Sequence, residues 1–149
     1  MSDEPAPEPL NIGLLLFIPY RALEARVFAA LAAAGYDDVT PAQARVFQRI
    51  APHGSRLTDL AQQALITKQS AGFLVDQLEK AGYVHRTADP SDARARLVRI
   101  SPRGAAAISI AAAVVAEVEA EWTAKLGQRR MGRLRQSLEM LREITDPYS

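Results

Sequence analysis

Apolar residues recur at helical spacing along most of the chain. Six segments carry this pattern, and each predicts an amphipathic helix. They cover residues 11–35, 40–50, 58–65, 68–81, 102–126 and 128–144. Thr40-Pro41 and Ser101-Pro102 place a capping side chain directly before a proline, which is typical of a helix start. Pro19 removes a backbone donor inside the first segment, so we expect that helix to kink near residues 15–19 rather than restart at the proline.

The third and fourth segments are short and close together. Thr58 and Thr67 are their predicted caps, and only Leu65-Ile66-Thr67 separates the two helices. A connection of that length holds two helices at a steep angle, as in a helix-turn-helix. Gly82 follows the fourth helix and supplies the left-handed residue with which many helices end.

Two segments with alternating apolar positions come next. Residues 83–87 and 96–100 are predicted strands, joined by a turn in which Asp89-Pro90-Ser91-Asp92 favours local hydrogen bonds. Arg56-Leu57 can add a brief strand before the third helix. The pattern therefore predicts a mainly α-helical protein with six helices and a small β-wing, in the order of a winged helix-turn-helix.

Charge is unevenly distributed, although the formal net charge of the 149 residues is only +1. Residues 1–48 hold three basic and six acidic side chains, residues 49–104 hold nine and five, and residues 105–149 hold six of each. The positive excess therefore lies on the paired helices and the hairpin, where a polyanion such as double-stranded DNA would bind.

Composition narrows the remaining classes of function. The chain has no cysteine, which excludes disulfides and cysteine nucleophiles, and its two histidines, His53 and His85, fit no metal-ligand spacing. We therefore expect no metal, no cofactor and no enzymatic activity. The apolar run 12–18 is too short to cross a bilayer, and residues 1–9 are acidic and proline-rich. We expect a cytoplasmic protein with no membrane partner.

The start of the fourth helix carries side chains that suit the major groove of DNA. Hydroxyl, ammonium and amide groups can bind phosphates or base edges there, a glycine permits close approach, and an exposed phenylalanine can touch a thymine methyl. These candidates are Thr67, Lys68, Gln69, Ser70, Gly72 and Phe73. The alternative is an ordinary solvated helix start, and the hairpin that follows favours DNA binding over it.

The hairpin supplies a second set of candidates. We expect Arg94 at the wing tip to enter a minor groove together with Arg96, and Asp92 to hold the Arg94 guanidinium in position. Arg56 and Arg86 complete the predicted DNA contacts. The alternative is a solvated hairpin with an incidental ion pair, worth under about 1 kcal/mol.

Several stretches give the chain a resemblance to a known family. Residues 57–61, 74–84, 89–94 and 97–101 resemble the multiple antibiotic resistance regulator (MarR) family, and the aspartate and arginine of the wing are the most specific part. The resemblance implies a winged helix, an obligate homodimer formed by the N- and C-terminal helices, and a palindromic operator. It also implies a repressor that a small ligand releases.

Two departures limit what the resemblance transfers. Phe73 and Gln77 stand where many members of the family carry basic residues, so the operator sequence cannot be carried over. The absence of cysteine separates this chain from the peroxide-sensing members.

The same interpretation divides the chain into parts. We expect residues 1–10 to form a disordered tail and residues 11–149 a single MarR-like domain. Its dimerisation helices would be 11–35 and 102–145, around a DNA-binding lobe at 40–101. The terminal helices carry more apolar surface than a small winged helix can cover, which favours a homodimer over an intramolecular bundle.

A ligand site is the least specified feature. Phe17, Tyr20, Phe47 and Trp122 could line a pocket between the terminal helices and the lobe, with Arg21 as an anchor for an anion. The resemblance implies an aromatic carboxylate or a phenol as the ligand of this pocket. The alternative is that these aromatics are plain core. The rival function is a winged-helix protein-interaction module without DNA binding, whose lobe would lack the positive charge found here.

Overall fold

A computed structural model describes residues 5–146 of the 149-residue chain. That part forms six helices and one two-stranded antiparallel sheet, which confirms the predicted fold class. In chain order the elements are α1 (Ile12–Ala33), α2 (Pro41–Phe47), α3 (Leu57–Gln63), α4 (Lys68–Lys80), β1 (Val84–Asp89), β2 (Asp92–Ile100), α5 (Pro102–Leu126) and α6 (Gln128–Thr145). Residues 5–10 have no helix or strand, and residues 1–4 of the predicted tail lie outside the described part. None of the helices described is long and apolar enough to cross a membrane.

Capping side chains begin four of these helices. Each accepts a hydrogen bond from a backbone amide of the first turn, which satisfies a donor that the helix itself leaves unpaired. The caps are Asn11, Thr40, Thr67 and Ser101. The three that the sequence predicts correctly are Thr40, Thr67 and Ser101. Helix α1 runs unbroken through Pro19, so the alternative of a restart is wrong, while a kink there stays a prediction.

Helix α3 begins earlier than predicted. Its N-cap is Arg56 and not Thr58, because Leu57 already packs against the core of the lobe as the first helical residue. The brief strand expected at Arg56-Leu57 is therefore wrong. Pairing occurs one residue before it, where Ser55 and Val98 exchange two backbone hydrogen bonds of 3.0 and 2.8 Å.

The wing is longer than predicted. Strand β1 pairs with β2 from Val84 opposite Ile100 to Ala88 opposite Arg96, and the register shifts after Ala88. Only Pro90 and Ser91 lie between the strands. Alternation of apolar residues does not extend to the outer half of the hairpin, so it could not reveal the extra length there.

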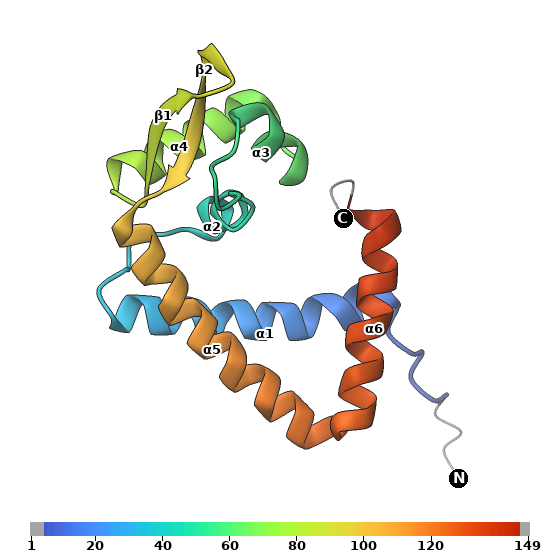
Figure 1. Cartoon of the computed structure of the whole chain (residues 1–149). Helices are drawn as coiled ribbons and strands as arrows, with labels where there is room; N and C mark the ends of the chain where they lie inside the picture. The colour runs from blue at the N-terminus through green and yellow to red at the C-terminus, as the bar shows by residue number, and fades with distance from the viewer. Residues whose placement is uncertain (1–4, 147–149) are drawn as a thin grey trace.

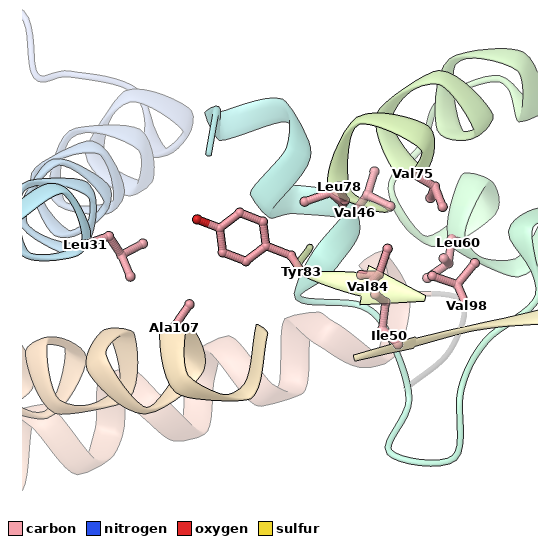
Figure 2. Packing of buried hydrophobic residues seen from close by; sticks show 10 residues of the cluster. All are labelled: Leu31, Val46, Ile50, Leu60, Val75, Leu78, Tyr83, Val84, Val98 and Ala107. Atoms are coloured by element: carbon pink, nitrogen blue, oxygen red, sulfur yellow. The ribbon is translucent and has the colours of Figure 1, made fainter. Parts of the chain in front are cut away.

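Two groups of elements share one core (Figure 1). Helices α2, α3 and α4 and the hairpin form a lobe at one end, and α1 packs along α5 below it. Figure 2 shows the ring of Tyr83 with Leu31 of α1 and Ala107 of α5 on one side. The buried residues of the lobe lie on its other side. The phenol therefore joins the core of the lobe to that of the long helices.

The junction at Tyr83 has polar contacts as well. The Tyr83 hydroxyl donates to Asp38, and Arg103 donates to the Tyr83 oxygen at 3.2 Å. The Arg103 guanidinium also lies 4.7 Å from the centre of the Tyr83 ring and 4.9 Å from that of Tyr36. Burial and the Asp38 carboxylate raise the pKa of Tyr83 to about 12. The phenol thus stays protonated and keeps its donor role at neutral pH.

Candidate nucleic-acid interface and adjoining cavity

The connection between α3 and α4 is tight. Leu65 adopts a positive φ of 56°, and the Ile66 amide then donates to the Ala61 carbonyl at 3.0 Å. The left-handed residue lets the chain reverse within three residues, which orients α4 as the second helix of a helix-turn-helix. Sequence reasoning found the short connection but not its geometry, since leucine is not a residue that indicates a positive φ.

The first turn of α4 presents polar groups to solvent. Thr67 caps the helix by accepting from the Ser70 amide at 3.0 Å, and its hydroxyl donates to the Ser70 hydroxyl at 2.9 Å. Lys68 and Gln69 are exposed and have no side-chain partner in the described part of the chain. Phe73, one turn later, is 62% exposed. The predicted recognition residues therefore lie on one accessible stretch of helix.

Gly72 has a different position from the one expected. A Cβ atom built on this residue would lie 3.5 Å from Leu57 of α3, so the missing side chain faces a neighbouring helix. The structure therefore gives Gly72 a place in helix packing, and the expected close approach of DNA to this glycine is not supported.

The base of the wing is tied to α3 by an ion pair. Arg56 donates to Asp89 through Nε at 2.9 Å and approaches the same oxygen through Nη2 at 2.8 Å. Ser91 donates to the other Asp89 oxygen through its amide at 2.9 Å and its hydroxyl at 2.7 Å. The Ser91 hydrogen bonds, with the Arg56 guanidinium, lower the pKa of Asp89 to about 2. Asp89, which sequence reasoning treated only as a turn residue, fixes the wing to the lobe.

The tip of the wing corrects the predicted pairing of Asp92 with Arg94. Asp92 accepts from the Arg94 backbone amide at 3.0 Å, and it makes no ion pair with the guanidinium. A carboxylate two residues before an amide closes a local turn more readily than it reaches along an extended side chain. The exposed Arg94 side chain has no partner among the described residues, while Arg96 donates weakly to the Arg86 carbonyl at 3.4 Å.

Arg86 forms ion pairs with other residues of the chain. Its guanidinium contacts Asp76 at 2.8 Å and Glu79 at 3.0 Å, and its side chain is only 17% exposed. These bonds join β1 to α4. Arg86 therefore has a structural role, because two carboxylates on an adjacent helix neutralise it, while its DNA contact stays a prediction.

Ion pairs sort the positive charge of the lobe into two groups. Of the nine basic residues in 49–104, four form ion pairs in the described part of the chain. These are Arg49, Arg56, Arg86 and Arg103. The five without such a pair there are Lys68, Lys80, Arg94, Arg96 and Arg99. The cations without an ion pair thus include Lys68 at the start of α4 and Arg94 at the tip of the wing, where an anion can reach them.

A cavity of about 410 Å³ lies beside this lobe. It is bounded by α1, α2, α5 and the Tyr83 junction, between the long helices and the lobe as predicted. Tyr20 and Phe47 line it, but Phe17, Arg21 and Trp122 do not. On α1 the lining residues include Tyr20, Glu24 and Leu31, whereas Phe17 and Arg21 are exposed and do not line the cavity.

The cation at the cavity is Arg45 of α2, which replaces the predicted Arg21. Its Nη2 lies 3.8 Å from Glu24, and the Tyr20 hydroxyl donates to the same carboxylate oxygen at 2.9 Å. Burial, followed by the Glu24 hydrogen bond, raises the pKa of Tyr20. No helical period of α1 alone could reveal Arg45, since it comes from another helix.

Trp122 belongs to a second cavity, of about 240 Å³, between α5 and α6. Its neighbours there include Met131, Leu134 and Leu138 of α6. In the described part of the chain, no group of three or more histidine, aspartate or glutamate side chains is placed to hold a metal ion.

The chain is similar in sequence and in fold to known proteins. A model of the MarR family matches residues 37–95, which cover α2, α3, α4 and most of the wing. No curated protein matches the chain in sequence. Among solved structures, a MarR family protein of Mycobacterium tuberculosis in complex with salicylic acid is 29% identical, with a TM-score of 0.63 over 90% of this chain and 98% of that one.

Two further solved structures share the fold. Wild-type MarR of Escherichia coli in its apo form is 23% identical, with a TM-score of 0.68 over 90% of this chain and 98% of that one. A mutant of MepR from S. aureus bound to an oligodeoxyribonucleotide is 17% identical, with a TM-score of 0.59 over 92% and 100% of the two chains. The match of residues 37–95 to the MarR family and the shared architecture agree with the helix-turn-helix and wing described above, and the chain has the winged-helix fold of these solved MarR structures.

Proposed function

We propose that this protein is a sequence-specific regulator that binds double-stranded DNA. The observation that carries the proposal is a set of three cations that form no ion pair in the described part of the chain, Lys68, Arg94 and Arg96, on an exposed helix start and an exposed wing. Figure 1 shows the hairpin projecting beside α4, with its tip pointing away from α1, α5 and α6. A helix and a wing so arranged suit a major groove and the groove beside it. The oligonucleotide bound by the MepR mutant supports DNA as a ligand of this architecture.

The exposed residues divide into two proposed roles. Gln69, with Thr67 and Ser70, reads base edges at the start of α4, while Phe73 contacts a sugar or a thymine methyl. Lys68, Arg94 and Arg96 supply the charge that releases counterions from the phosphates, and the two arginines enter the minor groove. Arg56 acts indirectly, by holding the wing base through Asp89.

We further propose that the DNA-binding form is a homodimer on a palindromic operator. The chain exposes 10603 Å², whereas a compact monomer of 16.2 kDa is expected to expose roughly 7,500 Å². Large apolar side chains exposed on α1 and α6 include Ile12, Ile18, Leu138 and Ile144. An apolar surface of this extent is stable in water only when another surface covers it, and a second copy covers it symmetrically.

The cavity is the proposed effector site, and its ligand is a small aromatic molecule. Its position supports this role, because residues of α1, α2 and α5 and the Tyr83 junction all line it. A ligand there changes the packing of the lobe on the long helices. The salicylic acid held by the Mycobacterium tuberculosis protein shows that a relative accepts a small aromatic compound. We propose that occupancy releases DNA and that the protein is a ligand-responsive repressor, which we expect to act in the cytoplasm.

The rival function is a winged-helix module that binds another protein and no DNA. A module of that kind has no need for unpaired cations at both the helix start and the wing tip. Binding to DNA and its salt dependence separate the two functions, since phosphate contacts give a steep decrease of affinity with salt.

The test is binding of the full chain to the DNA upstream of its own gene, by gel shift and fluorescence anisotropy at rising salt. We expect Arg94→Ala to weaken binding at least about tenfold and to flatten the salt dependence by about one unit of slope. Arg129→Ala is the matched control, because Arg129 is exposed at the start of α6 and outside the lobe. Equal DNA affinity of the wild type and the Arg94 variant would show that the tip of the wing does not contact DNA. If the wild type bound no DNA, the result would contradict the proposed regulator and favour the protein-interaction module.

A further inference from the structure

The charged groups that line the large cavity already neutralise one another. Its lining is apolar apart from Tyr20, Glu24, Arg45, Gln48 and Tyr83. Only Glu24 and Arg45 among these carry formal charges, and they lie 3.8 Å apart. The Glu24 side chain is 21% exposed, and it also accepts the Tyr20 hydroxyl at 2.9 Å. The cavity therefore offers an incoming anion no cation that lacks a counter-charge.

We propose that this cavity selects a neutral aromatic molecule that donates a hydrogen bond, and that it discriminates against aromatic carboxylates. This inference rests on the proposed effector site and names the chemical class of its ligand. A buried carboxylate needs a cation of its own to offset the loss of hydration. An anion that approaches Arg45 also approaches Glu24, so the attraction of one charge is opposed by the repulsion of the other.

The Glu24 carboxylate favours a donor on the ligand, while the amide of Gln48 can donate or accept. The Tyr83 hydroxyl already donates to Asp38 and accepts from Arg103, so this residue offers mainly its ring to the cavity. Glu24 keeps a second carboxylate oxygen, which accepts but cannot donate while ionised. A phenol or a primary amide meets that requirement. The apolar residues of α1 and α5, such as Val27 and Val115, suit its ring.

The test compares two probes that differ in charge but share a ring and a phenol group, salicylamide and salicylate. Both are added to the full chain at about pH 6, where the carboxylate is ionised. Binding is measured by calorimetry, thermal shift and release of operator DNA. We expect salicylamide to bind at least about tenfold more tightly than salicylate. Equal or tighter binding of salicylate would overturn the charge selectivity and leave the effector site intact.

Two variants test whether Glu24 causes the selectivity against an anion and whether the ligand binds in this cavity. Glu24→Gln keeps an acceptor for Tyr20 but removes the charge that opposes an anion, so salicylate affinity should rise about tenfold while salicylamide affinity changes little. Glu117→Gln is the matched control, because Glu117 forms a similar ion pair with Arg26 at 3.9 Å and does not line the cavity. Ala112→Phe fills the cavity from α5 and should abolish binding of both probes.

The outcomes are separable. An unchanged preference in a folded Glu24→Gln protein, as judged by its melting transition, would overturn the role of Glu24. Binding that survives Ala112→Phe would place the ligand elsewhere and refute the inference. If neither probe binds while operator DNA still does, the effector site itself is wrong and the DNA-binding function stands.

Discussion

At the scale of single residues, the most unusual backbone position is Leu65. Its φ of 56° is left-handed, a conformation that costs a leucine about 1–2 kcal/mol. The side chain is 83% exposed, so the lobe gains little from its burial. The turn between α3 and α4 therefore carries strain that the rest of the lobe sustains.

We predict that Leu65→Asn stabilises the protein by about 0.5–1 kcal/mol, because asparagine adopts the left-handed conformation at lower cost. Chemical unfolding monitored by circular dichroism measures the change. Leu65→Ala keeps the steric cost and is expected to have nearly the stability of the wild type. Equal effects of the two substitutions would show that the backbone conformation is not the cause.

Asp89 is a second residue of interest at this scale, because its lowered pKa makes the stability of the fold depend on pH. Its folded pKa is about 2, below the ordinary value near 3.9 for an aspartate. A depressed pKa means that the carboxylate stabilises the fold above about pH 4, and that this contribution is lost as the pH falls from about 4 to 2. The ion pair with Arg56 and the Ser91 hydrogen bonds are what is lost.

We therefore predict that Asp89→Asn is less stable than the wild type at neutral pH, and that the difference shrinks between about pH 4 and pH 2. Thermal melts over this range measure it. A difference that stays constant down to pH 2 would mean that the carboxylate charge does not stabilise the wing base.

At the scale of elements, the junction of α5 with the lobe depends on a close backbone approach. A Cβ atom on Gly104 would lie 2.3 Å from the Tyr83 carbonyl oxygen, and the Ser101 amide donates to that same oxygen at 3.0 Å. Glycine therefore lets the first turn of α5 pack on the residue that joins the two cores. The sequence shows Gly104 as an isolated glycine with no apparent reason.

We predict that Gly104→Ala destabilises the protein by about 1–3 kcal/mol, because the helix has to move away from a backbone atom. Gly72→Ala is the matched control. It adds the same methyl group within α4, where the contact with Leu57 is an ordinary 3.5 Å, and it should stabilise the helix by up to about 1 kcal/mol. Chemical unfolding of the two variants gives opposite signs if the close approach is the cause.

At the scale of the whole molecule, the arrangement of α1, α5 and α6 leaves apolar surface uncovered. Arg26 holds α1 to α5 through two hydrogen bonds to Glu121, of 2.7 and 3.1 Å. Beyond that point the first half of α1 has no buried residue, and neither does α6. The extended shape is therefore the one expected of a protomer that completes its core by association.

We predict that the combined change Leu15→Glu and Leu138→Glu raises the dimer dissociation constant at least about 100-fold, because it buries two carboxylates in an apolar interface. Sedimentation velocity at several concentrations measures it. Leu65→Glu is the matched control, since it changes an exposed leucine outside the terminal helices. A wild type that is monomeric at micromolar concentration would contradict the proposed dimer.

The sequence by itself determined the elements and their order. Helix caps such as Thr40, Thr67 and Ser101 act within one turn, and apolar periodicity reports which face of a helix is buried, so both can be seen locally. The same local signals placed α4 and the wing, and the order of charged residues along the chain located the excess of positive charge. They failed at Arg56, where burial of Leu57 against distant residues moved the helix start.

Only the tertiary structure decided which charged groups remain available. Arg86 and Arg94 lie on the same hairpin, yet two carboxylates from α4 pair with Arg86, and no carboxylate among residues 5–146 pairs with Arg94. The tertiary structure likewise replaced Arg21 by Arg45 at the cavity and set Glu24 beside it. Partners of this kind come from segments distant in sequence. Their distance and mutual neutralisation depend on how helices pack, which no local pattern of residues encodes.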